Sequence, residues 1–169
     1  MISAYLKLVT DTAGAIKGPV RDRDSARDGS IALLHVEHSV VSPRHPASGL
    51  ATGRRQHFPI TFTKETDTTS PLFYQLIARN ELIKSAEFFF FGHGAQSGLI
   101  ASRESIQYRI TLTKAWVARM ELVGLADEAA QQDKQFPLTE KISLVYDAIA
   151  WEWLSPNTTA NDTYSSVPP

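Results

Sequence analysis

The stretch SIQYRITLTKAWVARMEL, Ser105–Leu122, alternates between apolar and polar residues over most of its length. Its even positions are mainly apolar: Ile106, Tyr108, Ile110, Leu112, Trp116, Ala118, Met120 and Leu122. Successive side chains of a β-strand point to opposite faces, so this period of two predicts one long strand with one face in a core. Lys114 interrupts the apolar face, and we expect the strand to bend near Thr113-Lys114.

Shorter segments repeat the pattern. One apolar face is formed by Ile2, Ala4, Leu6 and Leu8, a second by Ala32, Leu34, Val36 and Val40, and a third by Phe58, Ile60 and Phe62. Near the end, the apolar residues first occupy even positions, at Ile142, Leu144 and Tyr146, and then odd positions, at Ile149, Trp151 and Trp153. One extra residue in a strand produces such a switch, which predicts a β-bulge near Asp147-Ala148.

One segment departs from the β pattern. Ser70 is placed as the N-cap of a short helix, Pro71 suits its first turn, and Asn80 suits its end. The sequence therefore predicts a mainly β protein, a compact β-barrel of two packed antiparallel sheets with one short flanking α-helix. We expect a single domain over residues 1–154 and a disordered tail over residues 155–169.

Composition narrows the function classes. The 169 residues carry a formal net charge of −1 and no cysteine. The lack of excess positive charge argues against nucleic acid as the main partner. The lack of cysteine excludes disulfides, thiol nucleophiles and thiolate metal sites. The N-terminus lacks the pattern of a cleaved signal peptide, and the longest apolar run is far too short for a membrane helix. We expect no membrane insertion.

Motifs for chemistry are weak. No G-x-S-x-G occurs, and Ser97 lacks the strand–turn–helix setting of a nucleophile. His35 and Glu37 share a strand face, but two ligands fall short of a metal site, and a surface or interface pair is favoured. Gly92, Gly94 and Gly98 precede a strand, whereas phosphate loops precede a helix. We expect no catalytic residue, no cofactor and no metal.

Two features suggest contacts with other chains. In KSAEFFFFGHGAQSG, Lys84–Gly98, the residues Phe89 and Phe91 face away from Phe88 and Phe90, so the strand is apolar on both faces. Either the helix or a neighbouring subunit is expected to cover Phe89 and Phe91. In the long polar loop Ser42–Gln56, the cluster Arg54-Arg55 is either an exposed loop end or a protein contact.

Several blocks resemble the Hcp family, the tube protein of bacterial type VI secretion systems. They are AYLKL at Ala4–Leu8 with Gly14–Gly18, SPRHPASGLATGRRQHFPITFTKETDTTSPLFYQLIARNELI at Ser42–Ile83, and EKISLVYDAIAWEW at Glu140–Trp153. The blocks agree in order and spacing, and the resemblance covers roughly residues 2–154. The segment Gly92–Glu104 carries no resemblance, because the family varies most there.

The resemblance implies a homo-hexameric ring with a wide pore, stacked into a tube inside a contractile sheath with a spike protein at its tip. It implies assembly in the cytoplasm, secretion without a signal peptide, effector proteins carried in the lumen, and no enzymatic activity. It also places Arg44, Arg54 and Arg55 in a loop that reaches the adjacent ring. The alternative is a non-secretory small β-barrel that binds a ligand or acts as an adaptor.

Overall fold

The structure is a computed structural model that describes residues 3–93, 104–124, 138–154 and 157–163. Its elements in chain order are β1 (Ser3–Thr10), β2 (Ala15–Ile16), β3 (Ile31–Leu33), β4 (His35–Glu37), β5 (Val40–Val41), β6 (Gln56–His57), β7 (Ile60–Glu65), α1 (Ser70–Arg79), β8 (Ile83–His93), β9 (Glu104–Val123), β10 (Thr139–Leu154) and β11 (Asn157–Thr163). The connection between β8 and β9, for which the sequence predicts a turn, lies outside the described residues.

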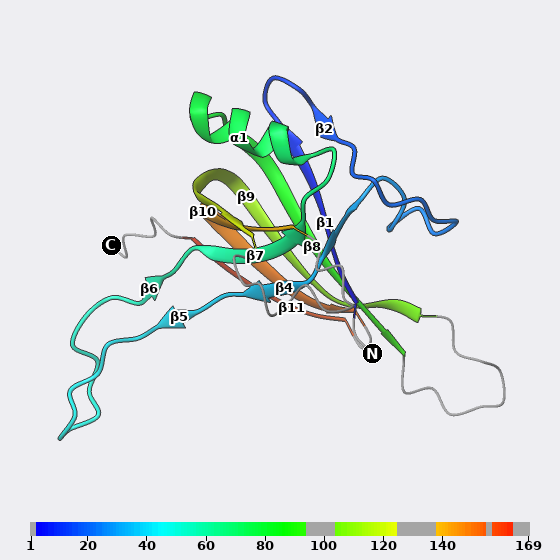
Figure 1. Ribbon diagram of the computed structural model, residues 1–169. Helices are drawn as coiled ribbons and strands as arrows, with labels where there is room; N and C mark the ends of the chain where they lie inside the picture. Colours follow the sequence, from blue (N-terminus) through cyan, green and yellow to red (C-terminus); the bar gives the residue numbers. More distant parts are fainter. Residues whose placement is uncertain (1–2, 94–103, 125–137, 155–156, 164–169) are drawn as a thin grey trace, which may run out of the picture.

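One curled antiparallel sheet forms the body of the protein (Figure 1). Its nine strands follow the order β2-β1-β8-β9-β10-β7-β4, with β3 added to β1 and β11 added to β10. Only Leu34 separates β3 from β4, so this short split segment links β1 at one end of the curl to β7 at the other. The mainly β, antiparallel class with one helix is therefore confirmed for the described residues.

The second sheet differs from the expected one. It contains only β5 and β6, which pair in a two-stranded ribbon that leaves the body instead of packing face to face on it. The core is therefore the inside of the curled sheet, and the long strands do not close into a continuous barrel. The centre of the core holds Phe62. Its ring centroid lies 5.9 Å from that of Phe73 on α1 and 5.7 Å from that of Phe88 on β8.

The helix lies across one end of the curled sheet (Figure 1). It ends at Asn80 as expected, with a left-handed φ of 48° that asparagine tolerates. Its N-cap is Thr69 instead of Ser70. The Ser70 hydroxyl donates to Glu140 Oε2 at 2.7 Å within the core. Phe73 and Leu76 are buried beneath the helix, whereas Leu72 is exposed.

The bend predicted at Thr113-Lys114 is confirmed. Lys114 has a φ of 51°, and the buried face of β9 changes from Ile110 and Leu112 before it to Ala115 and Val117 after it. Even positions therefore do not keep one face along the whole strand.

On β10, opposite this bend, the buried side chains change from even positions, ending at Tyr146, to odd positions, starting at Ile149. The pairing with β9 keeps its register there and shifts instead between Ser143 and Leu144. A matched break in both strands, not a bulge at Asp147-Ala148, produces the switch.

Strand β10 changes its partner at the same place. Its first half pairs with β7 as far as Leu144, opposite Ile60, and its second half pairs with β11 from Ala148 onward. The residue that would continue the β7 ladder is Pro59, which has no backbone N–H to donate. Tyr146 therefore lies in the gap where one partner strand has left and the other has begun.

The expected disorder of the tail is wrong for residues 157–163. These residues form β11, whose seven pairs with β10 run from Leu154 opposite Asn157 to Ala148 opposite Thr163. Pairing is possible because β7 leaves this edge of β10 open, and an open edge is a template for another strand. Residues 155–156 and 164–169 lie outside the described part of the chain.

The expected cover is corrected for Phe91, and Phe89 is likewise buried without a second subunit. Both are buried within the chain, with exposed fractions of 6% and 0%. The guanidinium carbon of Arg27 lies 4.2 Å from the Phe91 ring centroid, and the Tyr5 ring meets Phe91 edge-on at 5.5 Å. The segment between β2 and β3 thus supplies the cover over Phe91, so neither the helix nor a neighbouring subunit is needed there.

A close approach of backbone holds that covering segment in place. The Gly18 N–H donates to Gly29 O at 2.8 Å, and a Cβ at Gly18 would lie 2.0 Å from Ser30 O. Only glycine fits such a contact without moving the backbone. Lys7 Nζ also donates to Ser25 O at 2.7 Å, which ties the segment to β1.

A buried ion pair joins β7, β10 and the start of α1. The ammonium of Lys64, fully buried, lies 3.1 Å from Glu140 Oε2 and 3.1 Å from Asp67 Oδ1, and it donates to Ser70 Oγ at 3.0 Å. Glu140 is only 1% exposed. A buried charge without its partner is strongly destabilising, so each member of the group requires the others.

We expect Lys64→Met to lower the free energy of unfolding by about 3–5 kcal/mol, because Glu140 is then left charged and unpaired in the core. The double variant Lys64→Met/Glu140→Leu should regain most of the loss, since it replaces the pair by apolar groups of similar size. Urea denaturation followed by tryptophan fluorescence measures both. A single variant as stable as the unmodified protein would contradict this account.

Candidate functional site

The segment between β4 and β7 is a projecting hairpin, here called the arm (Ser39–Phe58) (Figure 1). Its two sides are tied by the β5–β6 pairing, by the bridge between Arg44 and Ala51, and by a hydrogen bond from Thr52 N to Pro43 O at 2.9 Å. Gly49, with a φ of 68°, turns the chain at the tip. The polar stretch read from sequence as an irregular loop is therefore a hairpin.

Most of the arm faces solvent. The side chains along it are exposed apart from Pro43, which is half-buried, and His57, which is buried at the base. Leu50 at the tip is 70% exposed, and Val40 and Val41 of β5 are 40% and 45% exposed. An isolated domain gains no stability from apolar side chains left in water, so this surface is a candidate for contact with another chain.

The structure separates the three predicted arginines. Arg44 Nη1 donates to Gly49 O at 3.0 Å and so stabilises the turn at the tip. Arg54 is exposed on the arm. Arg55 points back to the body, where its guanidinium makes two hydrogen bonds to the carboxylate of Asp162 on β11. Of the three, Arg55 thus has an intrachain role at the arm base.

A chain of hydrogen bonds fixes the arm base to the body. His57 Nε2 lies 2.9 Å from Asp162 Oδ2, and His57 Nδ1 lies 3.1 Å from the hydroxyl of Tyr146. That hydroxyl lies 2.6 Å from His38 Nε2, just before the arm begins. The His57 ring also stacks on Trp151, with an interplanar angle of 17° and centroids 6.4 Å apart. Both strands of the arm are therefore anchored where β10 changes partner.

The electrostatics follow from these contacts. The hydrogen bonds from Arg55 are the largest influence on Asp162 and, with that from His57, lower the pKa of its carboxyl to about 2. The same carboxylate raises the pKa of Arg55. Burial, followed by the nearby His57, lowers the pKa of His38, which favours a neutral imidazole. The ion pair between Arg55 and Asp162 is thus fully charged near neutral pH.

This arrangement resembles a proton relay whose two central groups are buried, since Tyr146 is 4% exposed and His57 is 7% exposed. Its end at His38 borders a hollow beside the arm base. Among the described residues, no group of three or more metal-ligating side chains comes together, and His35 meets only Glu37, at 3.0 Å. No helix in the described part of the chain is long and apolar enough to span a bilayer. The network ties both strands of the arm to Tyr146 of β10, and Asp162 of β11 completes it.

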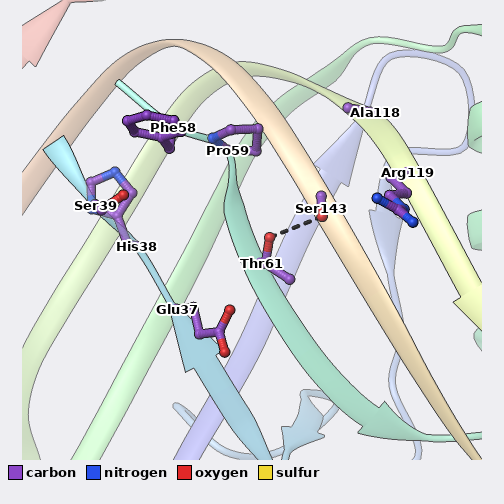
Figure 2. Close-up of a pocket in the computed structure, with 9 residues that line it drawn as sticks. All are labelled: Glu37, His38, Ser39, Phe58, Pro59, Thr61, Ala118, Arg119 and Ser143. Carbon is purple, nitrogen blue, oxygen red and sulfur yellow. Dashed lines mark hydrogen bonds between the residues drawn. The ribbon is translucent and has the colours of Figure 1, made fainter. Parts of the chain in front are cut away.

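A hollow lies beside the arm base (Figure 2). Phe58 and Pro59 form one side of it, and Glu37 and Arg119 add opposite charges from β4 and β9. Its wall includes the hydrogen-bonded hydroxyls of Thr61 and Ser143, 2.9 Å apart. The hollow is open to solvent and combines an exposed phenylalanine with charged side chains, as docking surfaces for other proteins often do.

Sequence reasoning missed the residues that anchor the arm. Asp162 lies in the tail that was expected to be disordered, and Tyr146 was read only as a core position of its strand. The contacts of Asp162 with Arg55 and His57 span more than a hundred residues of sequence, so no local spacing signals them. The one available hint was Pro59, which ends the β7 ladder and leaves room beside β10.

Comparison with known proteins supports one family. The family described as "Type VI secretion system effector, Hcp" matches residues 5–153. The major exported protein of Pseudomonas aeruginosa is 23% identical over 172 residues, which cover 96% of this chain and 95% of that protein. A crystal structure of an Hcp protein superimposes with a TM-score of 0.81 at 23% identity, covering 95% of this chain and 98% of that one.

A second solved structure shares the fold at a higher sequence identity. The Hcp1 protein of E. coli EAEC 042, solved as a mutant, gives a TM-score of 0.79 at 29% identity, covering 97% of this chain and 99% of that one. The fold and the match define a tube or effector protein of type VI secretion, a class that is not a known enzyme family. The chain belongs to the Hcp family, and β11 lies beyond the matched residues.

The pKa of Asp162 predicts a pH dependence of stability. Its value in the folded state, about 2, is below the ordinary 3.8, so the folded protein binds this proton less readily than the unfolded chain. The stabilisation is therefore fully present above the ordinary pKa and is lost as pH falls through about 2. We expect the difference in unfolding free energy between the unmodified protein and Asp162→Asn to be constant near neutral pH and to shrink under acid conditions.

Urea denaturation at a series of pH values measures this difference. Asp11→Asn is the matched control, because Asp11 forms an exposed ion pair with Lys84 away from the arm. A difference between the unmodified protein and Asp162→Asn that stays constant into strong acid would contradict the assignment.

Proposed function

We propose that this protein is a tube subunit that forms homo-hexameric rings, and that these rings stack inside a contractile sheath with a spike protein at the tip. The rings assemble in the cytoplasm and are then exported without a signal peptide, with effector proteins held in the lumen. The family match over residues 5–153 supports this proposal. The single domain expected over residues 1–154 would build the ring, with β11 added to its sheet.

The arm is the observation that carries the proposal. It places Leu50, Val40 and Val41 in solvent, away from the hydrophobic core, yet it is an ordered hairpin with cross-strand hydrogen bonds. Such a projection serves little purpose in a monomer. It suits a head-to-tail contact, in which the arm of one subunit meets a different surface of the next, the kind of interface that builds stacked assemblies.

The body argues against a ligand-binding barrel. Its interior is filled by Phe62, Phe73 and Phe88 together with the aliphatic side chains of the core. A filled interior leaves the curled sheet no internal site of the size that small ligands need. The hydrogen bonds that tie the arm base to β10 and β11 likewise suit a structural protein without catalytic activity, cofactor or metal.

Analytical ultracentrifugation with negative-stain imaging tests the proposal. We expect the unmodified protein to form particles of about six subunits with a central hole, which associate further into stacks as concentration rises. Arg54→Glu should shift stacks toward single rings, because it reverses a charge on the exposed side of the arm without breaking a bond to the body.

The matched control is Arg23→Glu, which makes the same charge change on the exposed segment between β2 and β3. It should assemble as the unmodified protein does. A stable monomer at micromolar concentration would refute the tube assignment. Stacks unchanged by Arg54→Glu would instead remove Arg54 from the stacking contact.

A further inference from the structure

We propose that the C-terminal strand β11 positions the arm, and that Asp162 is the clamp that sets the direction in which the arm leaves the body. Positioning follows from geometry within one chain. Its consequence for stacking rests on the proposed function, because only in a stack does the direction of the arm decide whether rings meet.

The composition of β11 favours positioning over a core role. Its sequence, NTTANDT, contains one apolar residue, Ala160, and the described side chains from Thr158 to Thr163 are exposed apart from Asp162. The strand therefore contributes little hydrophobic burial to folding. What it supplies is backbone pairing to β10 and one carboxylate that faces the arm.

Asp162 binds two side chains of the arm base, those of Arg55 and His57. Its carboxylate accepts two hydrogen bonds from Arg55 and one from His57, whose Nε2 lies 2.9 Å away. Its side chain is 19% exposed, and that of His57 is 2% exposed. Arg55 is 44% exposed, but its contact with Asp162 is bidentate, and a bidentate pair holds its geometry better than a surface ion pair with a single contact does.

The body grips His57 from the other side as well. The Tyr146 hydroxyl lies 3.1 Å from His57 Nδ1, and the Trp151 ring stacks on the imidazole. Both residues belong to β10, the strand to which β11 is paired. His57 lies in β6 of the arm, and only Phe58 and Pro59 separate it from β7 of the body. Contacts that fix His57 therefore also fix the base of the arm.

The family match covers only part of the clamp. The matched residues end at 153, whereas β11 begins at Asn157. Arg55 and His57 lie inside the match, and their partner Asp162 lies outside it. The C-terminal segment therefore adds a contact that the matched region does not contain by itself.

Hydrogen exchange of the full chain tests the clamp. In Asp162→Asn, amides at the arm base, such as that of Phe58, which donates to Ser39 O, should exchange about tenfold or more faster, since hydrogen bonds to charged groups are lost. Amides of β8 and β9 should keep the rates of the unmodified protein. Arg55→Gln should act in the same direction, and the double variant should be little worse than Asp162→Asn alone, because Asp162→Asn already removes the contact with Arg55.

Three results would overturn the proposal. One is unchanged exchange at the arm base, which would mean that the clamp does not hold the arm. Another is an equal loss of protection in β8 and β9, which would show a general folding role for Asp162. The third is strict additivity of the two substitutions. Asp11→Asn serves as the control and should change none of these rates.

Assembly is measured separately on the same variants. Asp162→Asn should leave rings intact and weaken stacking, although the exposed arm residues Leu50 and Arg54 are unaltered. If the unmodified protein formed no rings, the proposed function would fail while the exchange result still decided the clamp. Faster exchange at the arm base combined with unchanged stacking would refute the consequence for assembly.

Discussion

The change of partner along β10 is the constraint on which the rest of the structure depends. Strand β10 pairs with β9 from Thr139 to Trp153, but β7 accompanies it only as far as Leu144. Pro59 cannot continue the β7 ladder, so the chain leaves the sheet there as the arm. The edge that β7 abandons is taken by β11, and Tyr146 in the gap between the two partners contacts the arm base. Projection and anchoring of the arm thus have one cause.

The rest of the body keeps this junction rigid. The left-handed Lys114 on β9 and the parity change on β10 occur opposite each other, so the curled sheet bends without losing its register there. The buried group of Lys64, Glu140 and Ser70 fixes β7, β10 and α1 to one another. A rigid junction matters for an assembly protein, since an arm on a loose base loses conformational entropy whenever it binds.

The sequence predicts those features whose causes are local. Alternation predicts β9, Lys114 predicts its bend, and Pro71 with Asn80 predicts the helix, because each signal lies within a few residues of its effect. The strand β11 escapes prediction because NTTANDT has no apolar alternation and pairs only with an edge left free by distant Pro59. The cover on Phe91 escapes for a similar reason, since Arg27 lies far away in sequence and its charge suggests solvent. The family can be predicted from the resemblance of the sequence. The residues that anchor the arm can be found only from the fold, because they lie far apart in the sequence.

Site-specific cross-linking determines whether the arm reaches another copy of the chain. The chain has no cysteine, so Leu50→Cys introduces a single thiol at the exposed tip, to which a short photoreactive maleimide can be attached. We expect irradiation of the assembled protein to join the arm tip to the body of a second subunit, identified by mass spectrometry of peptides from mixed light and heavy protein. Cross-links confined to a single chain, under conditions where the protein is assembled, would contradict this expectation.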